Sequence, residues 1–571
     1  MDLQKALSGY VQQMLSSVPG LKALILDDET AGIIGLTYTQ TELTTADVYL
    51  VERLNARSHG DDVQRHLKAV VFIRPTAENN LLMRKELSNP SFGEYFIFFS
   101  NAIRRTLLED LAEADIDSKV IEVKEIFADI YALNPHVFSL NVSPCLDINK
   151  GISHNPRFER VVEGLFSSML ALKRRPIIRY DGVSALCRNI AERLSVRMDQ
   201  ERTLFDFRQA DTPTVLILDR REDPITPLLN QWTYEAMAHQ LLGLQNNRVD
   251  LTGAPNVKKD AAEFALDARS DGFYKRNMYL NFGELGDNVK HLVDTFQAKH
   301  KMNDRLDSID DMMRFVENYP EFRKIGHNVT KHVTLLGELS RLVDKQQLLE
   351  VSQLEQDLAC RESEAEHQER VLKALKSFRI SRHDKLKLVL LFALRYESSA
   401  ERILSALLQG LYESGLGSDQ VALVKGLIKL AGSSIRHGDV FNNRSFLAMA
   451  RSSVRRGFGG VANVYTQHEP LLAATLDEAL RGRLRATEYP SIHGDMPSAS
   501  REWIIFIAGG ITCEEARCVA EINRMAPATS ADKSFVASAR AAAEANNSFV
   551  VLGGSTLHNS RSFLAEVTRV T

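Results

Sequence analysis

Unbroken apolar runs alternate with helical patterns through the first 130 residues of the chain. Each run is four to six residues long and ends at charged residues or proline, which is typical of a strand buried on both faces. Strands that alternate with helices favour a doubly wound parallel sheet. This pattern predicts a first α/β domain over about 1–132, and its expected strands cover residues 21–26, 47–51, 69–73, 94–99 and 119–123.

The same pattern continues after Pro135 and is then interrupted by a long helical region. Between about 245 and 490 the pattern is almost wholly helical, and two further buried runs follow near the C-terminus. The simplest architecture is therefore a second α/β domain into which a helical domain is inserted. Its expected strands cover residues 138–141, 177–180, 215–218, 503–508 and 548–552.

Two long amphipathic stretches, 283–318 and 322–369, lie inside the helical region and are separated at Asn318-Tyr319-Pro320. Leucines recur near heptad spacing in the second stretch, with charged residues between them. The pattern alone favours a helical hairpin that packs on itself, and the alternative is a partner-binding surface. The leucines are Leu335, Leu339, Leu342, Leu349, Leu354 and Leu358.

The stretch Thr214–Leu244 combines a strand, a charged corner and a pattern that predicts a helix over 228–242. Asp219 and Asp223 follow the strand, where carboxylates can hold Mg²⁺ or form a phosphoaspartate. The two carboxylates are four positions apart, however, and Arg220 and Arg221 lie between them. Guanidinium groups beside carboxylates form internal ion pairs, so the pattern favours a structural corner over a catalytic one.

Other motifs of enzyme and metal sites are absent from the sequence. The glycine pairs at 509–510 and 553–554 follow strands but lack the lysine of a P-loop and the three-glycine dinucleotide fingerprint, so tight turns are expected. There is no HExxH zinc motif, no GxSxG elbow and no CxxC among the five cysteines. We expect no catalytic residue, cofactor or metal.

Charge and hydropathy restrict the class of partner. Seventy basic and 74 acidic residues give a net charge of −4, which does not favour nucleic acid as a partner. The N-terminus has no signal-peptide core, and no apolar run reaches the length of a membrane span. We expect a cytosolic protein without direct membrane insertion, whose membrane association comes through a partner.

Four segments together carry a family resemblance. Residues 218–236 read LDR-x-x-D-x-x-TPLL-x-x-x-TY-x-A and resemble the signature of the Sec/Munc-type (SM) proteins, which bind syntaxins and regulate SNARE-driven membrane fusion. Phe506, Gly509, Gly510, Thr512 and Glu515 resemble a second SM element. The segment 461–472 is similar to the endosomal, vacuolar-protein-sorting branch, and so is Tyr38–Leu43. The signature residues are Asp219, Arg220, Asp223, Thr226, Pro227 and Tyr234.

The resemblance implies an arch of three domains and a function without catalysis. Domain 1 would cover 1–132, domain 2 would combine 133–245 with 490–571, and domain 3 would be the helical insert 246–489, with a SNARE-templating hairpin over about 283–369. The implied partner is a trans-Golgi or endosomal syntaxin, bound through its N-terminal peptide and its helical core. The assembled SNARE bundle, a vesicle R-SNARE and a Rab effector are further implied contacts. The implied location is the cytoplasm, with peripheral recruitment to Golgi and endosomal membranes through the SNARE.

The resemblance also assigns roles to individual residues. The syntaxin N-peptide pocket maps onto Leu108 and Leu111 in a helix and onto Val123 and Glu125 in the following strand. At each position the alternative is ordinary domain packing, since leucines between a helix and a sheet are usually core residues. Asp27 matches an acidic residue of the central syntaxin-binding cavity. Pro320 matches the hinge of the hairpin, where a proline interrupts a helix.

One competing hypothesis comes from a different functional class. A doubly wound sheet can also carry a nucleotide-sugar or phosphoryl transferase, which would act at Asp219 and Asp223. The absence of a phosphate-binding loop weighs against it.

Overall fold

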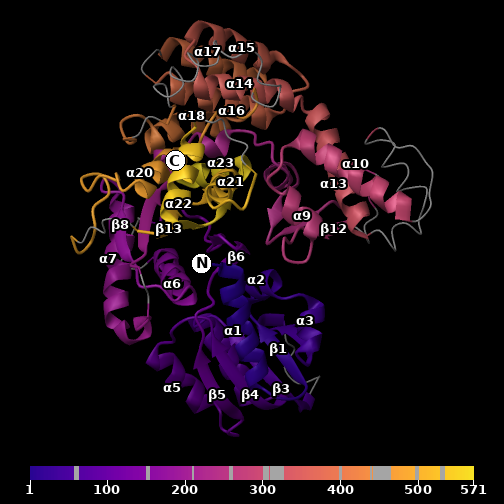
Figure 1. Ribbon diagram of the computed structural model, residues 1–571, viewed down its shortest axis with the longest axis vertical. Coiled ribbons are helices and arrows are strands. Elements are labelled where there is room, and N and C mark those ends of the chain that lie inside the picture. The colour runs from indigo at the N-terminus through magenta and orange to yellow at the C-terminus, as the bar shows by residue number, and fades with distance from the viewer. Residues whose placement is uncertain are drawn as a thin grey trace.

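A computed structural model describes the chain except for residues 57–63, 149–154, 209–210, 256, 258–261, 300–307, 309–326, 398–400, 438–439, 442–463, 495–499, 528–533 and 571. The molecule is an arch of two α/β units and a helical unit (Figure 1). The N-terminal sheet lies at one end and the helices α14 to α18 at the other. Among the helices that the structure describes, none combines the length and the hydropathy of a membrane-spanning segment.

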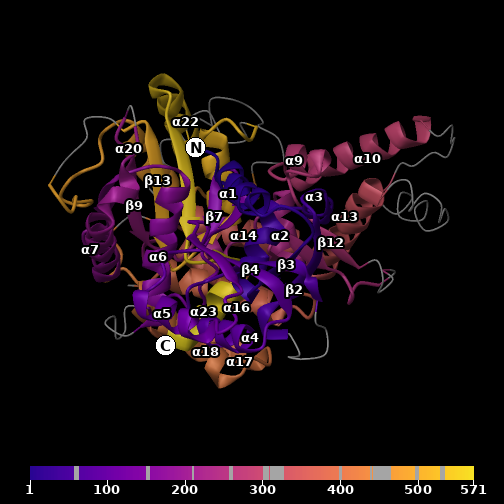
Figure 2. The same ribbon diagram turned by 90° about the horizontal axis from the view of Figure 1, so that it is seen from below.

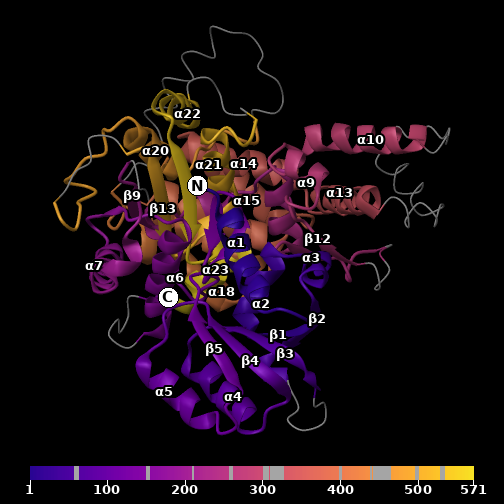
Figure 3. The same cartoon turned by 60° about the horizontal axis from the view of Figure 1, so that its bottom comes forward.

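The first sheet has five parallel strands in the order β2-β1-β3-β4-β5. Alternate residues of each strand enter separate cores on the two faces, since Leu24 and Leu26 pack with α1 and α2 whereas Ala23 and Ile25 pack with α4 and α5. Figure 3 shows α4 and α5 below this sheet. The elements are α1 (Leu3–Ser17), β1 (Lys22–Leu26), α2 (Asp28–Thr37), α3 (Gln40–Thr45), β2 (Val48–Arg53), η1 (Leu54–Ala56), β3 (Gln64–Ile73), α4 (Ala77–Ser88), β4 (Phe92–Phe99), α5 (Arg105–Ala114) and β5 (Val120–Glu125).

The second sheet joins strands from distant parts of the chain in the order β6-β7-β15-β13-β9-β8. All neighbouring pairs are parallel except the antiparallel pair of β6 with β7. Segments 131–219 and 502–554 therefore form one sheet, as the sequence predicts. The elements are β6 (Tyr131–Asn134), β7 (Val137–Ser139), α6 (Pro156–Ala171), β8 (Ile177–Tyr180), α7 (Ala185–Gln200), η3 (Arg202–Phe205), β9 (Thr214–Asp219), α20 (Leu471–Leu480), β13 (Glu502–Ala508), β14 (Ile511–Thr512), α21 (Cys513–Ile522), α22 (Phe535–Asn546), β15 (Phe549–Gly554), β16 (Leu557–His558) and α23 (Ser560–Val570).

The inserted region is mainly helical, but it also contains a small antiparallel sheet that the sequence pattern does not predict. Its strands β10, β11 and β12 are only two or three residues long, too short to give a periodic pattern. The elements are β10 (Leu244–Gln245), β11 (Arg248–Asp250), β12 (Glu263–Ala265), α9 (Gly272–Asn277), α10 (Phe282–Lys299), α13 (His327–Lys345), α14 (Leu348–Cys360), α15 (Glu364–Lys376), α16 (Arg382–Arg395), α17 (Glu401–Glu413) and α18 (Ser418–Ala431).

The long helical stretch predicted over 322–369 is not one continuous helix. Its described part consists of α13, α14 and the start of α15, and Gln347 adopts a left-handed conformation between the first two. The leucine stripe is divided accordingly. Leu335 and Leu339 pack in the core around α9 and α10, whereas Leu354 and Leu358 pack in the core of α14 to α18. These four leucines are intramolecular core residues, the interpretation that the pattern favoured.

The helices α10 and α13 lie side by side and project from the rest of the arch (Figures 1 and 2). They flank the hinge predicted at Pro320, which lies outside the described residues.

Candidate functional site

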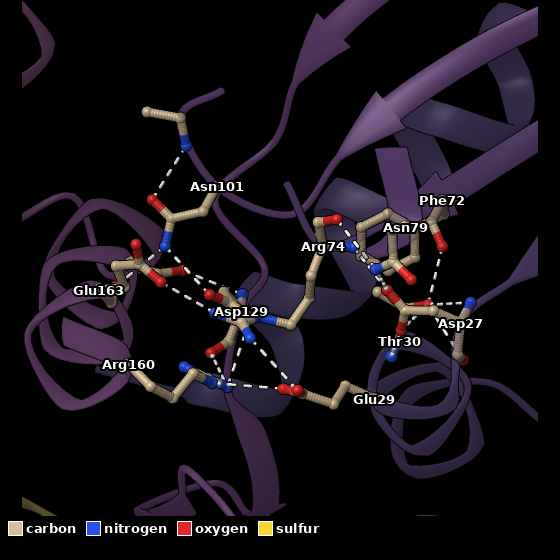
Figure 4. Close-up of polar contacts among 12 residues, drawn as sticks. Asp27, Glu29, Thr30, Phe72, Arg74, Asn79, Asn101, Asp129, Arg160 and Glu163 are labelled. Carbon is tan, nitrogen blue, oxygen red and sulfur yellow. Dashed lines mark hydrogen bonds and ion pairs between the residues drawn. The ribbon is translucent and has the colours of Figure 1, made fainter. Parts of the chain in front are cut away.

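The first sheet has its topological switch point between β1 and β3, where open α/β sheets bind ligands at the carboxyl ends of the strands. Here a cluster of buried and partly buried side chains fills that position (Figure 4). Arg74 follows β3 and donates hydrogen bonds to Asp129 at 3.0 Å, to Glu29 at 3.2 Å and to Glu163 at 2.9 Å. Because Glu163 belongs to α6, the second α/β unit contributes directly to this closure.

Two further residues complete the cluster from both sides. Arg160 of α6 donates to Glu29 at 3.3 Å and to the backbone oxygen of Asp129 at 3.1 Å. Asn101 follows β4 and donates to Asp129 at 3.1 Å. Burial opposes the charge of Arg74, but the carboxylates of Asp129, Glu29 and Glu163 hold its pKa above the ordinary value. The switch point is thus occupied by an internal ion-pair network.

Asp27, the predicted cavity residue, is buried and caps α2. One carboxylate oxygen accepts hydrogen bonds from the backbone and hydroxyl of Thr30 at 2.7 and 2.9 Å. The other accepts from the backbone N–H of Arg74 and from Asn79, each at 2.6 Å. Both oxygens therefore accept hydrogen bonds from donors within the chain, which gives Asp27 a structural role. Its contact with a partner stays a prediction.

The signature corner after β9 is a second buried ion-pair cluster. Arg220 pairs with Glu515 of α21 at 2.7 Å and with Asp223 at 3.5 Å, and Arg221 pairs with Asp219 at 2.6 Å. Both arginines neutralise carboxylates inside the chain, as the sequence predicts. Groups of three or more metal-ligating side chains are absent from the described residues.

Asp223 connects this corner to the segment around His468. Its carboxylate accepts hydrogen bonds from the Thr226 hydroxyl at 2.6 Å and from the Leu471 backbone at 3.1 Å, and His468 Nε2 lies 3.2 Å from the same hydroxyl. Burial by itself would raise the pKa of Asp223, but Arg220, His468 and the Thr226 bonds lower it below the ordinary value. Pro227 lies in the short 3₁₀ turn η5 (Thr226–Leu228) beside this cluster.

The continuous helix predicted over 228–242 is wrong. Leu229 has an extended backbone, the helix α8 covers only Tyr234–Met237, and π-helix η6 (Ala238–Leu242) follows. Thr233 forms a bridge with Asn281, and this tertiary contact replaces helical hydrogen bonds. The signature residue Tyr234 is buried, and its hydroxyl lies 2.9 Å from Nδ1 of His332 in α13.

The glycine turns of the second sheet are filled by neighbouring side chains. Gly509 and Gly510 have φ values of +94° and +98°. A Cβ at Gly509 would lie 2.8 Å from Cβ of Arg220, and one at Gly510 would lie 2.4 Å from the His558 ring. The turn at Gly509–Gly510 needs glycine for its conformation and for the close approach of side chains, as the sequence predicts. The turn expected at Gly553–Gly554 is wrong, because both residues belong to strand β15, where a Cβ at Gly553 would lie 2.1 Å from the Phe138 ring.

The four residues of the predicted peptide pocket have different environments. Leu108 and Val123 are each 38% exposed, whereas Leu111 is buried in the core between α5 and the sheet. Register places Val123 opposite Ile97 and Glu125 opposite Phe99, on the face that α5 covers. Exposed Glu125 accepts the backbone N–H of Ile103 at 2.8 Å. Leu108 on α5 and Val123 and Glu125 on edge strand β5 are thus exposed, and Leu111 is core, the alternative that the sequence left open.

A cavity of about 330 Å³ lies between β5, α1 and α6, and Glu125 is also among its lining residues. Phe98 and Lys124 line it from the sheet, Tyr10 and Met14 from α1, and Leu170 from α6. The sequence offered no signal for this cavity, because its walls come from segments that only the tertiary structure brings together.

Comparisons with known proteins give a consistent result. Residues 22–566 match the model of the Sec1 family. Vacuolar protein sorting-associated protein 45 of Mus musculus is 41% identical over 572 residues, which cover 99% of this chain and 96% of the mouse protein. The homolog of that protein in Arabidopsis thaliana is 42% identical over 580 residues, covering 99% and 98% of the two chains.

Solved structures agree over the whole length. The structure described as SM protein Vps45 in complex with Qa SNARE Tlg2 matches with a TM-score of 0.85 and 38% identity, covering 100% of this chain and 98% of that chain. The Unc18 protein from the Unc18–syntaxin 1 complex of Monosiga brevicollis matches with a TM-score of 0.78 at 20% identity, which reflects the shared fold alone.

Proposed function

Because this chain belongs to the Sec1 family, we propose that it binds a syntaxin-type (Qa) SNARE and regulates SNARE-driven vesicle fusion in endosomal and vacuolar protein sorting. The observation that carries the proposal is the full-length structural match to a Vps45 protein bound to its Qa SNARE. The assembled SNARE bundle, a vesicle R-SNARE and a Rab effector are further proposed contacts.

The function needs no catalysis. In both α/β sheets the carboxyl ends of the central strands are filled by internal ion pairs, around Arg74 in the first and around Arg220 in the second. A transferase acting at Asp219 and Asp223 would need these carboxylates to face a ligand, but both are buried and bonded within the chain. A specific ligand at a concentration well above its Kd would stabilise the folded protein by a few kcal/mol. We expect no such stabilisation by Mg²⁺ with a nucleotide or nucleotide sugar, so the melting temperature should stay unchanged.

The proposed division of labour follows the three parts of the arch. Domain 1 (1–132) binds the N-terminal peptide of the SNARE on its outer face. Domain 2 (133–245 with 490–571) supports the arch, and domain 3 (246–489) carries the templating hairpin. The helical core of the SNARE lies between domains 1 and 3. Recruitment from the cytoplasm to Golgi and endosomal membranes comes through this SNARE.

We place the peptide site on the strip formed by Leu108, Val123 and Glu125. Two apolar side chains are exposed there beside a carboxylate, a combination that suits a short peptide with an apolar anchor and a basic residue. Strand β5 is also an edge of its sheet, so no further strand covers this border. Leu111 supports the site from the core.

The test is binding of a fluorescent syntaxin N-terminal peptide to the full chain and to Leu108→Arg. The substitution puts an unpaired charge in the strip, and we expect it to weaken binding at least about tenfold, the equivalent of about 1.4 kcal/mol. Val196→Arg is the matched control, because Val196 is an exposed residue on α7 of the second α/β unit.

Equal melting temperatures of the two variants and the wild type establish that folding is intact. Peptide binding that survives Leu108→Arg would move the site and leave the function in place. Failure to bind any Qa SNARE, as peptide or full-length protein, would reject the function itself.

A further inference from the structure

A fully exposed phenylalanine protrudes from the helical end of the arch. Phe378 lies in the short connection between α15 and α16, and its side chain is 104% exposed. The other exposed apolar residues of the described chain reach at most 82%, at Ile116. A single exposed apolar side chain is common on protein surfaces and by itself marks no site. What distinguishes Phe378 is the positive charge around it.

Four cations surround this ring in the sequence. Lys373, Lys376, Arg379 and Arg382 are all exposed, and none has a carboxylate of the described chain within salt-bridge distance. Other arginines nearby differ, because Arg341 of α13, Arg361 after α14 and Arg370 of α15 each pair with a carboxylate. The end of α15, the α15–α16 loop and the start of α16 therefore carry four cations without a salt-bridge partner among the described residues, around an apolar tip.

The loop has a fixed position against the α13–α14 junction. Ser377 Oγ lies 3.4 Å from Oε1 of Gln347, and Arg379 donates to the backbone oxygen of Asp344 at 3.2 Å. That junction adds exposed Lys345 and Leu349, the latter 44% exposed, beside the acidic residues Asp344 and Glu350. Because these contacts already fix the loop, binding through its ring and cations would not cost the entropy of ordering the loop.

We infer that this loop touches an anionic membrane surface, with the cations at the lipid headgroups and Phe378 in the interfacial layer. Charge complementarity supports this occupant, because Lys and Arg are attracted to anionic lipids and aromatic rings favour the interface. A protein partner usually seats such a ring in a matched pocket as part of a broad buried patch, whereas a bilayer accepts a single protruding side chain without shape complementarity.

The contact goes beyond the proposed function and does not depend on it. The loop contacts only the interfacial layer of the membrane. It therefore provides a weak direct attachment in addition to the recruitment through a SNARE. Its contribution is the orientation of the helical end of the arch toward the membrane.

The experiment uses the full chain and vesicles that contain no protein. Flotation with phosphatidylcholine vesicles containing 30 mol% phosphatidylserine should recover the wild type, and pure phosphatidylcholine vesicles should not. Lys376→Glu/Arg379→Glu should reduce binding by at least about fivefold for each of the two cations removed. Phe378→Ser removes the ring and should also reduce recovery. Raising the salt concentration should weaken binding further, because salt screens surface charge.

Matched controls separate this site from general surface effects. Lys425→Glu/Lys429→Glu changes two exposed lysines of α18, and Leu81→Ser removes an exposed apolar side chain of α4. Both should bind vesicles like the wild type. A Phe378→Trp variant adds a direct readout, since the two native tryptophans, Trp232 and Trp503, are buried. Its emission should shift to the blue when anionic vesicles are added.

Three results would overturn the inference. In the first, anionic vesicles recover the wild type only at background level. In the second, the loop variants bind vesicles as well as the control variants do. In the third, the tryptophan emission of Phe378→Trp does not change when anionic vesicles are added. If the loop variants lose binding to a Qa SNARE instead, the loop is a protein interface and the membrane assignment is wrong. Binding to a SNARE that is retained alongside any of these results leaves the proposed function intact.

Discussion

The carboxylate of Asp223 accepts a hydrogen bond from the backbone N–H of Leu471 at 3.1 Å, although the two residues are 248 positions apart in the chain. This bond joins the corner after β9 to the start of α20. Thr226 donates to the same carboxylate, and His468 lies against the Thr226 hydroxyl. The two segments, which both resemble family signatures, are thus parts of one buried structure. Hydrogen bonds between them explain why polar residues occur at these buried positions.

Replacement of Asp223 by Asn should destabilise this junction. The change removes the charge that faces Arg220 and weakens the acceptor for Thr226 and Leu471, so we expect a loss of about 2–3 kcal/mol. Differential scanning fluorimetry should show a clearly lower melting temperature. Asp477→Asn is the control, because Asp477 pairs with Arg481 near the surface, where such pairs contribute about 0–1 kcal/mol. Equal effects of the two variants would contradict this account.

The Arg74 network should hold the two α/β units together. Arg74→Met leaves Asp129, which is fully buried, without its closest cation, and breaking a buried pair costs about 3–5 kcal/mol. We expect a lower melting temperature and faster proteolysis between the units. Arg53→Met removes an exposed pair with Asp28 and should cost less than about 1 kcal/mol. A mild effect at Arg74 would mean that Arg160 alone suffices to neutralise Asp129.

Two glycines should respond to alanine in opposite directions. At Gly510 the φ is +98° and a Cβ would lie 2.4 Å from the His558 ring; both oppose a side chain, so Gly510→Ala should cost about 1–3 kcal/mol. At Gly9, inside α1, a Cβ meets nothing within 4 Å, so Gly9→Ala should stabilise by about 0.5–1 kcal/mol. Melting temperatures of the two variants provide the check. A neutral Gly510→Ala would show that the turn relaxes easily.

The stability of the chain should depend on pH through Glu235. Burial raises the pKa of Glu235 to about 7, although the Tyr274 hydroxyl bond opposes the shift. The unfolded state releases this proton near its ordinary value of 4.5, so the contribution of Glu235 to stability falls as the pH rises from there to about 7. Glu235→Gln cannot ionise, and its stability relative to the wild type should rise by about 2–3 kcal/mol over this range.

The measurement is the difference in melting temperature between Glu235→Gln and the wild type at pH 5 and at pH 8. The buried histidines titrate in both proteins, so their contribution to the pH dependence of stability cancels in this difference. A difference that stays constant with pH would show that Glu235 is ionised in the folded protein at both values.

Most strands of the two sheets could be predicted from the sequence, because they are apolar runs bounded by charge, proline or glycine. Strand β6 (Tyr131–Asn134) was not predicted. It also predicted that Asp219 and Asp223 are neutralised by arginines, since the four groups are neighbours in the chain. Local pattern failed where tertiary contacts override it. Thr233 bridges to Asn281, so the helix expected over 228–242 begins only at Tyr234, and the leucine stripe divides between two cores at Gln347.

The surroundings of the candidate site residues depend on tertiary packing. Leu108 and Leu111 are one turn apart on the same helix, and their sequence spacing cannot tell which of them faces the sheet. Asp27 follows a strand as a ligand-binding carboxylate would, yet Thr30, Asn79 and the Arg74 backbone saturate both of its oxygens. The hydrogen-bond partners of a buried polar group come from segments that are distant in the chain. A local sequence pattern therefore cannot predict which partners the group will have.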